Sequence, residues 1–447
     1  MTSANRAYGK IAFVTLGCAK NEVDSERMQA RLRAAGFELT DDPEGSDAII
    51  INTCSFITEA TEEAIAAILE VAELEHFSRG SGRIIVAGCM PSRYGEDLAA
   101  ELPEVSAFVP CAREENIVSV VFEVLGLPAD ELAGVGEPAF LRTTESSWAY
   151  VKIADGCGRR CSYCTIPLIR GEYQSETPER IVAEITGLVD SGVREIILIA
   201  QDTGIWGQDL RSNSEIKNLS DLLVYLARRF PATWFRVMYL QPGGITDELL
   251  DTMASYDNIC NYLDIPLQHA SAKILREMNR SGCIEEHLSL LARIREKLPD
   301  AVLRTTVITG FPGESDKDAD ELEAFIAAAE FDYVGIFAYS QEDGTEAGRR
   351  DDQVPDAIRL ARMQRLRDLA DSIGFSKVAR RIQTTEEVLV TGYEEDSSDD
   401  PYPVLGRTKR QAPEVDGMTH LDQGRIGELL SATMIDAYCY ELDGRRI

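Results

Sequence analysis

The chain has 447 residues, too many for one ordinary core, so two or three domains are predicted. It is 44% hydrophobic and 27% charged, a globular composition that excludes collagen-like and broadly disordered chains. The net charge of −31 argues against a general nucleic-acid binder, because such proteins usually carry a basic footprint. It favours a basic protein partner, although acidity can also serve solubility alone.

No apolar stretch approaches the roughly 20 residues that span a bilayer, and the first ten residues lack the apolar region of a signal peptide. We therefore expect a cytoplasmic protein with no membrane partner. In such a protein, the ten cysteines are more often metal ligands or catalytic groups than disulfides.

The first segment, to about residue 135, alternates strands and helices. Its continuous β-branched runs are typical of a parallel sheet that is buried on both faces. The order β-α-β-α-β predicts a doubly wound α/β domain over residues 8–135. Strands are predicted at Lys10–Leu16, Ala48–Asn52 and Arg83–Ala87, with helices at Glu22–Ala35 and Ile57–Glu75.

A connector rich in proline, glycine and charge, Pro128–Glu145, marks a domain boundary. A second α/β segment follows over residues 143–380, with Thr177 as a helix N-cap and Pro178 in the first turn. Six strand–helix units in tandem predict a partial (β/α) barrel. The strands are predicted at Ala149–Ile153, Glu195–Ala200, Phe235–Leu240, Tyr262–Pro266, Leu303–Ile308 and Tyr333–Tyr339.

A long polar helix, Asp356–Arg380, leads into a last segment of different character, residues 381–447. Short runs separated by Gly, Asp and Pro turns predict a small all-β barrel. From residue 382 on there are fourteen Asp and Glu against six Lys and Arg, and the acidic run Glu394–Asp400 is expected to be a solvated loop. Strands are predicted at Glu387–Thr391, Pro403–Gly406, Glu428–Ala432 and Tyr438–Leu442.

The strongest chemical signal is a CxxxCxxC motif, Cys157, Cys161 and Cys164, in the loop after the first barrel strand. Closely spaced thiolates on one loop are the usual ligands of iron–sulfur clusters. Three ligands leave one iron of a four-iron cluster open, as a catalytic metal requires, and active sites of barrels lie at this end of the strands. The alternative is a zinc site, for which His269 is the one distant candidate for a fourth ligand.

Three further cysteines each follow the carboxyl end of a predicted parallel strand: Cys18, Cys54 and Cys89. In an open α/β sheet these ends share one crevice, so the three thiols are expected to converge on a second cluster. The remaining cysteines show no such pattern and are expected to be packing or surface residues: Cys111, Cys260, Cys283 and Cys439.

Two loops that follow barrel strands are positioned to contact a cofactor. One contains Gln201, Asp202 and Thr203, and the other contains Gly310 and Glu314. As short strings they are weak signals, because Gly and Pro in such loops often serve only the turn.

A CxxxCxxC motif after a strand, with an aromatic residue before its last cysteine, resembles the radical S-adenosylmethionine superfamily. The resemblance implies that the open iron chelates the cofactor's methionine moiety and that an electron from the cluster cleaves the sulfonium to a 5′-deoxyadenosyl radical. The cofactor does this chemistry, while the protein orients it and excludes water.

Longer strings resemble the methylthiotransferase family within that superfamily. They are TLGCAKN (15–21), INTC (51–54), YLDIPLQHAS (262–271), TGFPGE (309–314) and the pair Gly406-Arg407. The resemblance covers nearly the whole chain and implies three domains: a methylthiotransferase N-domain, a radical-SAM core and a C-terminal TRAM barrel. It also implies two 4Fe-4S clusters and S-adenosyl-L-methionine (SAM) as cofactors.

Two branches of the family compete. One modifies an adenosine of tRNA, and the other modifies the β-carbon of an aspartate in the small-subunit ribosomal protein numbered twelve. LGCAKN (16–21), AQDT (200–203) and APEVDG (412–417) are similar to strings of the ribosomal-protein branch, and the acidic tail suits a basic ribosomal protein. The chain departs from the family pattern at Ala19, where proline is usual, and at Glu176, where arginine is expected.

The resemblance thus implies an enzyme that methylthiolates this ribosomal protein, with an external electron donor and without dominant RNA binding. The alternatives are a tRNA adenosine methylthiotransferase and, from a different class, an iron–sulfur carrier without turnover. The open iron of a three-cysteine site argues against the carrier.

Overall fold

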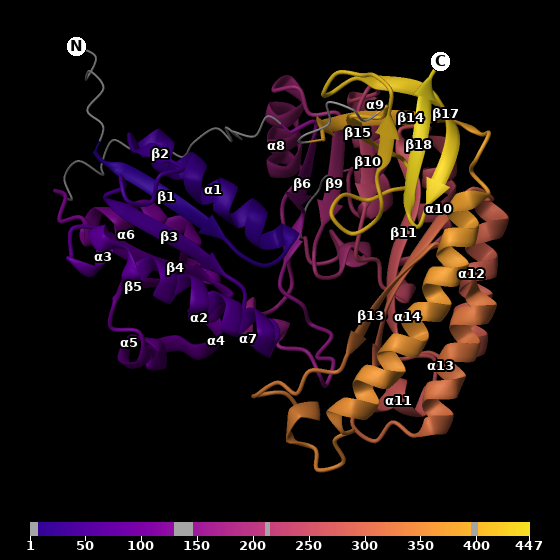
Figure 1. Ribbon diagram of the computed structural model, residues 1–447, viewed down its shortest axis with the longest axis horizontal. Helices are drawn as coiled ribbons and strands as arrows, with labels where there is room; N and C mark the ends of the chain where they lie inside the picture. Colours follow the sequence, from indigo (N-terminus) through magenta and orange to yellow (C-terminus); the bar gives the residue numbers. More distant parts are fainter. Residues whose placement is uncertain (1–7, 129–145, 211–214, 395–400) are drawn as a thin grey trace. The chain divides into compact units, whose positions relative to one another are not determined.

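The computed structural model describes residues 8–128, 146–210, 215–394 and 401–447, and Figure 1 shows its elements. The chain divides into two compact units. Unit 1 comprises residues 1–144, 155–160 and 164–174, and unit 2 comprises residues 145–154, 161–163 and 175–447. The predicted connector Pro128–Glu145, apart from Pro128, and most of the run Glu394–Asp400 lie outside the described residues. The three predicted domain ranges stay predictions.

Within its described residues, unit 1 is built on a five-stranded parallel sheet in the order β2-β1-β3-β4-β5. All six residues of the central strand β3 are buried, as its run of isoleucines predicts. The strands are β1 (Lys10–Thr15), β2 (Glu38–Thr40), β3 (Ala48–Thr53), β4 (Arg83–Gly88) and β5 (Val105–Pro110).

Helices cover both faces of this sheet, which confirms the doubly wound architecture (Figure 1). Ile50 packs with residues of α1 and α6, whereas its neighbours Ile49 and Ile51 pack with residues of α2, α4 and α5 on the opposite face. The period-two alternation of a strand thus supplies two cores. The helices are α1 (Ala19–Ala35), α2 (Thr58–Glu73), α3 (Glu75–Ser78), α4 (Cys89–Tyr94), α5 (Leu98–Glu101) and α6 (Ile117–Val124), with short 3-10 turns η1 (Gly95–Asp97) and η2 (Cys111–Asn116).

The described part of unit 2 contains a six-stranded parallel sheet in the order β13-β12-β11-β10-β9-β6, which confirms the predicted partial barrel. Strand bounds agree with the predicted ones to within a few residues. The strands are β6 (Trp148–Lys152), β9 (Glu195–Ile199), β10 (Trp234–Val237), β11 (Ile259–Gln268), β12 (Val302–Thr309) and β13 (Tyr333–Ala338).

Helices alternate with these strands, and the predicted cap is present: the Thr177 hydroxyl accepts the Arg180 amide at 3.3 Å. The long helix α14 (Asp356–Ala379) contacts α13 and β13. The other helices are α8 (Pro178–Asp190), α9 (Leu219–Arg229), α10 (Asp247–Ser255), α11 (Ala272–Glu277), α12 (Ile284–Lys297) and α13 (Asp316–Ala329), and shorter elements are β7 (Ala154–Asp155), α7 (Ile166–Ile169), β8 (Gln174–Ser175), η4 (Thr203–Ile205), η5 (Pro242–Gly244) and η6 (Ala347–Arg349).

The last segment closes into a β-barrel, as predicted, around a core that includes Val388, Met434 and Leu442. The chain turns at Cys439, whose φ of 54° is left-handed, so the final strand begins three residues later than predicted. The short strand β16 was not predicted. The strands are β14 (Thr385–Tyr393), β15 (Val404–Thr408), β16 (Thr419–Leu421), β17 (Leu429–Tyr438) and β18 (Glu441–Arg446).

Buried polar contacts join this β-barrel to the six-stranded sheet within unit 2. Glu195, on β9, is fully buried between Arg236 at 2.8 Å and Arg407 of the β-barrel at 2.7 Å. Tyr262 donates to buried Asp416 at 2.7 Å. Since unpaired charges at such depth are costly, the β-barrel and the sheet stabilise each other. In the described parts of the chain, no helix is long and apolar enough to cross a bilayer.

Candidate functional site

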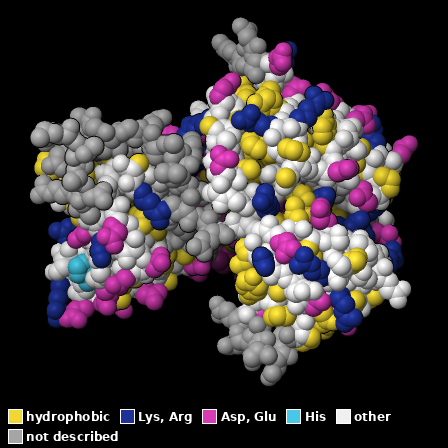
Figure 2. Space-filling model, turned by 90° about the horizontal axis from the view of Figure 1, so that it is seen from above, with side chains coloured by type: hydrophobic (Ala, Val, Ile, Leu, Met, Phe, Trp, Pro, Cys, Tyr) yellow, Lys and Arg dark blue, Asp and Glu magenta, His cyan; other side chains and the backbone are white. Residues whose placement is uncertain are grey.

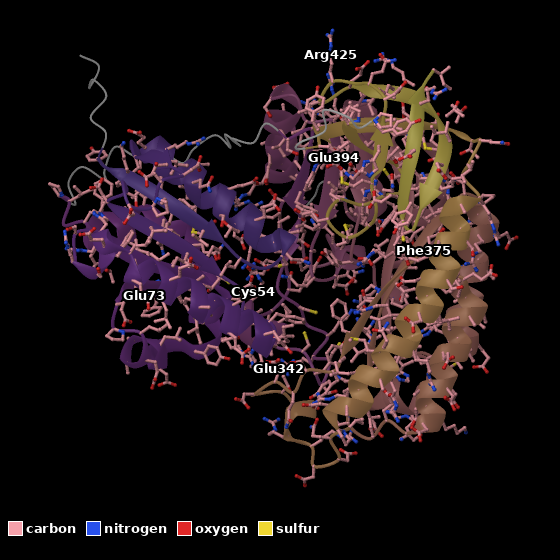
Figure 3. The ribbon with its side chains drawn as sticks, in the orientation of Figure 1. Cys54, Glu73, Glu342, Phe375, Glu394 and Arg425 are labelled. Carbon is pink, nitrogen blue, oxygen red and sulfur yellow. The ribbon has the colours of Figure 1, made fainter. Side chains whose placement is uncertain are left out.

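The carboxyl edge of the unit 1 sheet brings together the three cysteines that were predicted to converge. Cys18 is the N-cap residue of α1, Cys54 follows β3, and Cys89 begins α4. Figure 3 labels Cys54. The residues before Cys54 and Cys89, Thr53 and Gly88, are paired in the sheet, and Gly17, next to Cys18, lies against the Cys54 side chain. Cys54 and Cys89 are 8% and 4% exposed, whereas Cys18 is exposed.

Two glycines allow the loops to approach so closely. A Cβ atom on Gly17, whose φ is +99°, would lie 2.5 Å from the Cβ of Cys54. A Cβ atom on Gly88, whose φ is +91°, would lie 2.2 Å from Asn52 Oδ1. Both positions therefore require glycine for conformation and for space.

Asn21 organises the loops around the three thiols. This buried side chain donates to the Leu16 and Thr53 carbonyls at 2.9 Å each, and its Oδ1 accepts from the Cys89 thiol at 3.6 Å. The same Oδ1 accepts from Arg170 at 2.8 Å. Asn21 thus ties the ends of two strands to the thiol of a third.

Arg170 is the buried cation of this site, with a side chain only 2% exposed. It pairs with Asp24 at 2.8 Å and Asp155 at 2.9 Å, and it donates to the Cys89 thiol at 3.9 Å. Burial opposes its charge, but the two carboxylates outweigh burial and keep the pKa of Arg170 well above its usual value. The arginine therefore stays charged beside the thiols.

The protonation of the buried thiols is coupled. The hydrogen bond from Cys89 lowers the pKa of Cys54 although burial opposes it. A hydrogen bond from Cys111 favours the Cys89 thiolate, yet the bond to Cys54 and burial together raise the pKa of Cys89 to about 12. Metal binding would therefore release protons from this site.

The structure also places Cys111 here, because Pro110 and Gly88, the residues directly before Cys111 and Cys89, are paired in the sheet. It had been expected to be a packing or surface residue. Cys111 directly follows strand β5, and this position could have indicated its place in the site, but β5 was not predicted from the sequence. Of the other three cysteines in that group, Cys260 is fully buried and Cys439 is exposed.

The loop that carries the CxxxCxxC motif follows β6 and β7, as predicted. In unit 1, the Cys157 amide donates to the Gly171 carbonyl at 3.1 Å. Gly156 has a φ of +75°, and a Cβ atom there would lie 2.2 Å from the Glu172 carbonyl oxygen. The backbone on either side of the motif is therefore drawn together by contacts that require glycine.

In unit 2, Arg280 binds the middle cysteine of the motif. Its guanidinium donates to the Cys161 thiol at 3.8 Å, to Gln241 Oε1 at 2.5 Å and to the Pro266 carbonyl at 2.6 Å. The Ser162 hydroxyl donates to the Glu277 carbonyl at 2.7 Å. No sequence motif had indicated Arg280 or Gln241, because their contacts are long-range.

The predicted cofactor residues lie in loops after barrel strands. Asp202 and Thr203 are fully buried after β9, and the Thr203 hydroxyl donates to the Met238 carbonyl at 2.6 Å. Gln201, just before them, is half-buried. Gly310, after β12, has a φ of +75°, and its amide donates to Glu314 at 2.7 Å.

Glu314 organises its own loop. Its carboxylate accepts from the amides of Gly310 and Phe311 and from Arg362 of α14 at 2.8 Å. Nε2 of His269 lies 3.4 Å from the same carboxylate, and Nδ1 of His269 accepts the Ser271 amide. Nδ1 of His269 is therefore engaged within its own loop, whereas its buried Nε2 makes no hydrogen bond with any described residue.

Across the described ranges, no three His, Cys, Asp or Glu side chains are arranged to hold a single metal ion. The ligands of a four-iron cluster each bind a different iron, so they are spread more widely than ligands of one ion. The converging thiols of Cys18, Cys54 and Cys89 are soft donors of the kind that such clusters prefer. This donor set therefore fits an iron–sulfur cluster.

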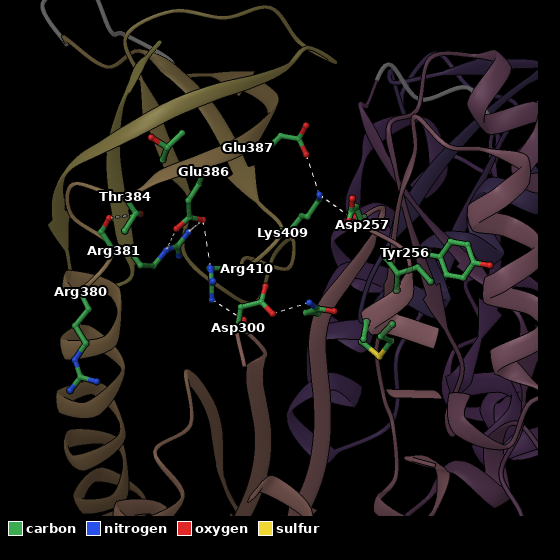
Figure 4. A pocket seen from close by; sticks show the side chains of 15 residues that line it. Tyr256, Asp257, Asp300, Arg380, Arg381, Thr384, Glu386, Glu387, Lys409 and Arg410 are labelled. Carbon is green, nitrogen blue, oxygen red and sulfur yellow. Dashed lines mark hydrogen bonds and ion pairs between the residues drawn. The ribbon is translucent and has the colours of Figure 1, made fainter. Parts of the chain in front are cut away.

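A pocket of about 810 Å³ lies elsewhere in unit 2, near the amino ends of β11 and β14 (Figure 4). Its charged groups bind one another: Arg381 pairs with Glu386 at 2.6 Å, and Lys409 pairs with Glu387 at 3.2 Å. Catalytic groups of barrels lie at the carboxyl ends of the strands, where the motif loop begins. The pocket is therefore separate from the proposed chemistry.

Comparison with known families assigns the two α/β segments. Residues 10–110 match the family model described as "Uncharacterized protein family UPF0004", and residues 151–326 match "Radical SAM superfamily". Among solved structures, the fold is similar to a radical S-adenosylmethionine methyltransferase, TsrM, from Kitasatospora setae (TM-score 0.57, 14% identity, 76% of this chain and 77% of that one). It is also similar to the cobalamin-dependent radical enzyme OxsB (TM-score 0.50, 13% identity, 81% and 56%).

Curated relatives match nearly the whole chain. A protein of Geobacter sulfurreducens is 40% identical over 99% of this chain and 100% of its own length. A protein of Heliobacterium modesticaldum is 42% identical over 98% and 95%. Both carry the name "Ribosomal protein uS12 methylthiotransferase RimO".

Proposed function

Because the chain belongs to the RimO family of ribosomal protein uS12 methylthiotransferases, we propose that it transfers a methylthio group to the β-carbon of an aspartate in that small-subunit protein. The observation that carries this function is the convergence of Cys18, Cys54 and Cys89 at one sheet edge. The same chain presents a second cysteine trio after a barrel strand, in a segment that matches the radical-SAM model.

Each trio is proposed to hold one 4Fe-4S cluster with an open iron. When bound, the clusters and SAM supply the radical, the sulfur and the methyl group. The chain's own contribution is positional. Arg280 holds the Cys161 thiol, whereas Arg170 and Asn21 hold the Cys89 thiol. These N–H donors stabilise the negative charge of thiolate-bound clusters.

Gln201, Asp202, Thr203, Gly310 and Glu314 remain our proposed cofactor-binding positions. Thr203 and Glu314 make hydrogen bonds that hold the backbone of their loops in place. These loops would then form the surface against which SAM binds. Loops at the carboxyl ends of barrel strands are where such sites form.

The C-terminal β-barrel is proposed to dock the basic substrate. Three of its six basic side chains contact the rest of unit 2, Arg407 at a buried site and the other two at the surface. Arg407 pairs with Glu195, and Lys409 and Arg410 donate to the Asp257 and Asp300 carbonyls. Lys409 and Arg410 also pair with Glu387 and Glu386 of the barrel, whereas Arg407 is neutralised by Glu195 outside it. The barrel segment keeps fourteen carboxylates against six cations, which favours a basic partner. On the face in Figure 2, acidic and basic side chains are interspersed.

A basic ribosomal protein suits this surface better than RNA, whose phosphates would be repelled. We also propose an external electron donor, because reductive cleavage of SAM needs an electron, and a cytoplasmic location, where ribosomal substrates occur.

Mass spectrometry of ribosomal protein uS12 and of bulk tRNA from cells that lack this gene tests the function. We expect the methylthio mass shift on uS12 to disappear and tRNA to be unchanged. The purified, anaerobically reconstituted enzyme should restore the shift with SAM, a sulfur source and a reductant. A shift lost from tRNA instead would assign the adenosine-modifying reaction, and an enzyme that never cleaves SAM would support a carrier.

A further inference from the structure

Four cysteines, not three, line the carboxyl edge of the unit 1 sheet. The sheet register pairs Thr53 with Gly88 and Gly88 with Pro110. The residues that follow these three positions are Cys54, Cys89 and Cys111, so they stand level on three neighbouring strands. Cys18 lies on the other side of Cys54, after β1, because β1 pairs with β3.

Cys111 is held against Cys89. The Cys111 amide donates to the Ser92 hydroxyl at 2.8 Å. That hydroxyl donates in turn to the Gly88 carbonyl at 3.0 Å, directly before Cys89. Ser92 therefore clamps the backbones on which the two cysteines are carried.

The two cysteines stand on neighbouring strands. Such strands lie about 4.8 Å apart, so a metal centre that reaches one thiol lies within a small side-chain rotation of the other. Both residues offer iron the same soft sulfur donor.

We propose that Cys111 is an exchange ligand of the N-terminal cluster, able to replace Cys89 on the same iron. The step is a ligand exchange without oxidant or reductant: Cys111 loses its thiol proton on binding iron, and the released Cys89 thiolate takes up a proton. This inference rests on one part of the proposed function, namely that Cys18, Cys54 and Cys89 hold a cluster.

The test uses the full-length chain with Cys157, Cys161 and Cys164 replaced by Ala, so that all iron reports on the N-terminal site. In this parent, C89A, C111A and C89A/C111A are reconstituted anaerobically. We expect C111A and C89A to keep most of the parent's iron, and the double variant to lose at least about five-sixths of it. The electron paramagnetic resonance signal of reduced C89A should shift, because one ligand has changed. In C89A, Cys111 should resist alkylation until the iron is chelated.

C18A in the same parent is the matched control. Cys18 stands on the far side of Cys54, so Cys111 cannot replace it, and C18A should lose its iron despite an intact Cys111. Equal iron loss in C89A and in the double variant would overturn the inference while leaving the proposed function intact. So would equal retention in C18A and C89A, which would indicate general tolerance. A parent that binds no cluster would overturn both. Circular dichroism of the iron-free chains separates loss of ligand from loss of fold.

Discussion

Arg170 donates to the thiol of Cys89 from a sequence position that is 81 residues away, at a distance of 3.9 Å. The same arginine lies in the segment that follows the CxxxCxxC motif, six residues after Cys164. One buried side chain therefore connects the segment of one cysteine trio to a thiol of the other. Both sides of this contact belong to unit 1.

The first prediction concerns that contact. R170Q should cost about 3–5 kcal/mol of stability, because Asp24, 3% exposed, would keep a buried charge without its cation. R170K keeps the charge but loses the forked geometry, so it should fold, cleave SAM, and form at least about tenfold less methylthio product. The reduction potential of the N-terminal cluster should shift in R170K, because a thiolate loses its donor.

The matched control is R160Q in the same loop. Arg160 pairs with Glu172 at 3.2 Å, and both side chains are about three-quarters exposed. Such surface pairs contribute little. If R160Q and R170K behave alike in product yield and potential, the buried contact has no special role.

The second prediction separates the two trios. Replacement of Cys157, Cys161 and Cys164 by Ala should abolish 5′-deoxyadenosine formation, since these residues lie in the segment that matches the radical-SAM model. Replacement of Cys18, Cys54 and Cys89 should spare that cleavage and abolish the product. Iron content, 5′-deoxyadenosine and modified uS12 are measured together. Normal SAM cleavage by the first variant would contradict the assignment.

The third prediction concerns Arg280. R280Q should bind iron but cleave SAM at least about tenfold more slowly, because the donor to Cys161 and the contact with Gln241 are lost together. R276Q is the control: Arg276 is exposed on helix α11 (Ala272–Glu277), which ends three residues before Arg280. Single-turnover formation of 5′-deoxyadenosine is the measurement. Equal rates in both variants would show that Arg280 only packs.

The fourth prediction concerns the join between sheet and β-barrel. R407A should destabilise unit 2 by about 3–5 kcal/mol, because Glu195, 0% exposed, would lose one of its two cations. R425A removes an exposed cation of the same β-barrel (labelled in Figure 3) and should change stability by less than about 0.5 kcal/mol. Chemical unfolding, followed by tryptophan fluorescence, compares them. If R407A unfolds with the same free energy as the natural chain, the contacts around Glu195 adjust to the loss of Arg407 without a measurable cost.

The fifth prediction is a pH dependence. Burial, helped by the charge of Arg280, lowers the pKa of His287 to about 4 from an ordinary 6.5. Between these values the unfolded chain binds a proton that the folded chain does not. His287 therefore contributes full stability above pH 6.5, and about 3 kcal/mol is lost as pH falls to 4.

H287Q cannot titrate, so its stability relative to the natural chain should improve steadily from pH 7 to pH 4. Unfolding midpoints of the two proteins, measured across that range, give the difference directly. A difference that stays constant with pH would mean that His287 is protonated in the folded state.

The convergence of Cys18, Cys54 and Cys89 could be predicted because parallel strands end at one edge, whatever the details of packing. Cys111 was missed because β5 is a half-exposed edge strand that ends in proline, and it lacks the long aliphatic run of β3. The pairing of Arg170 with Asp24 was out of reach, since no local pattern reports which distant charges meet. The same limit applied to Glu195 and Arg407.

The tail illustrates a different limit. Its β character followed from its turn residues, but β16 has only three residues, and the turn at Cys439 depends on one left-handed residue. The buried contacts of Glu195 and Tyr262 join the β-barrel to the sheet within one compact unit, and no local pattern indicated these contacts. Deleting the β-barrel would therefore destabilise the core of unit 2 as well as remove the proposed docking surface.

The discontinuity of unit 1 has a consequence for synthesis of the chain. Asp24 leaves the ribosome 146 residues ahead of Arg170, the cation that neutralises it in the folded protein. At about 5–20 residues per second, the interval is roughly 7–30 seconds. During that time the sheet edge can assemble around Cys18, Cys54 and Cys89, but its buried carboxylate does not yet have the Arg170 guanidinium beside it. We expect the nascent N-terminal unit to stay loosely packed until Arg170 emerges. The iron–sulfur cluster should therefore be inserted there only late in synthesis of the chain.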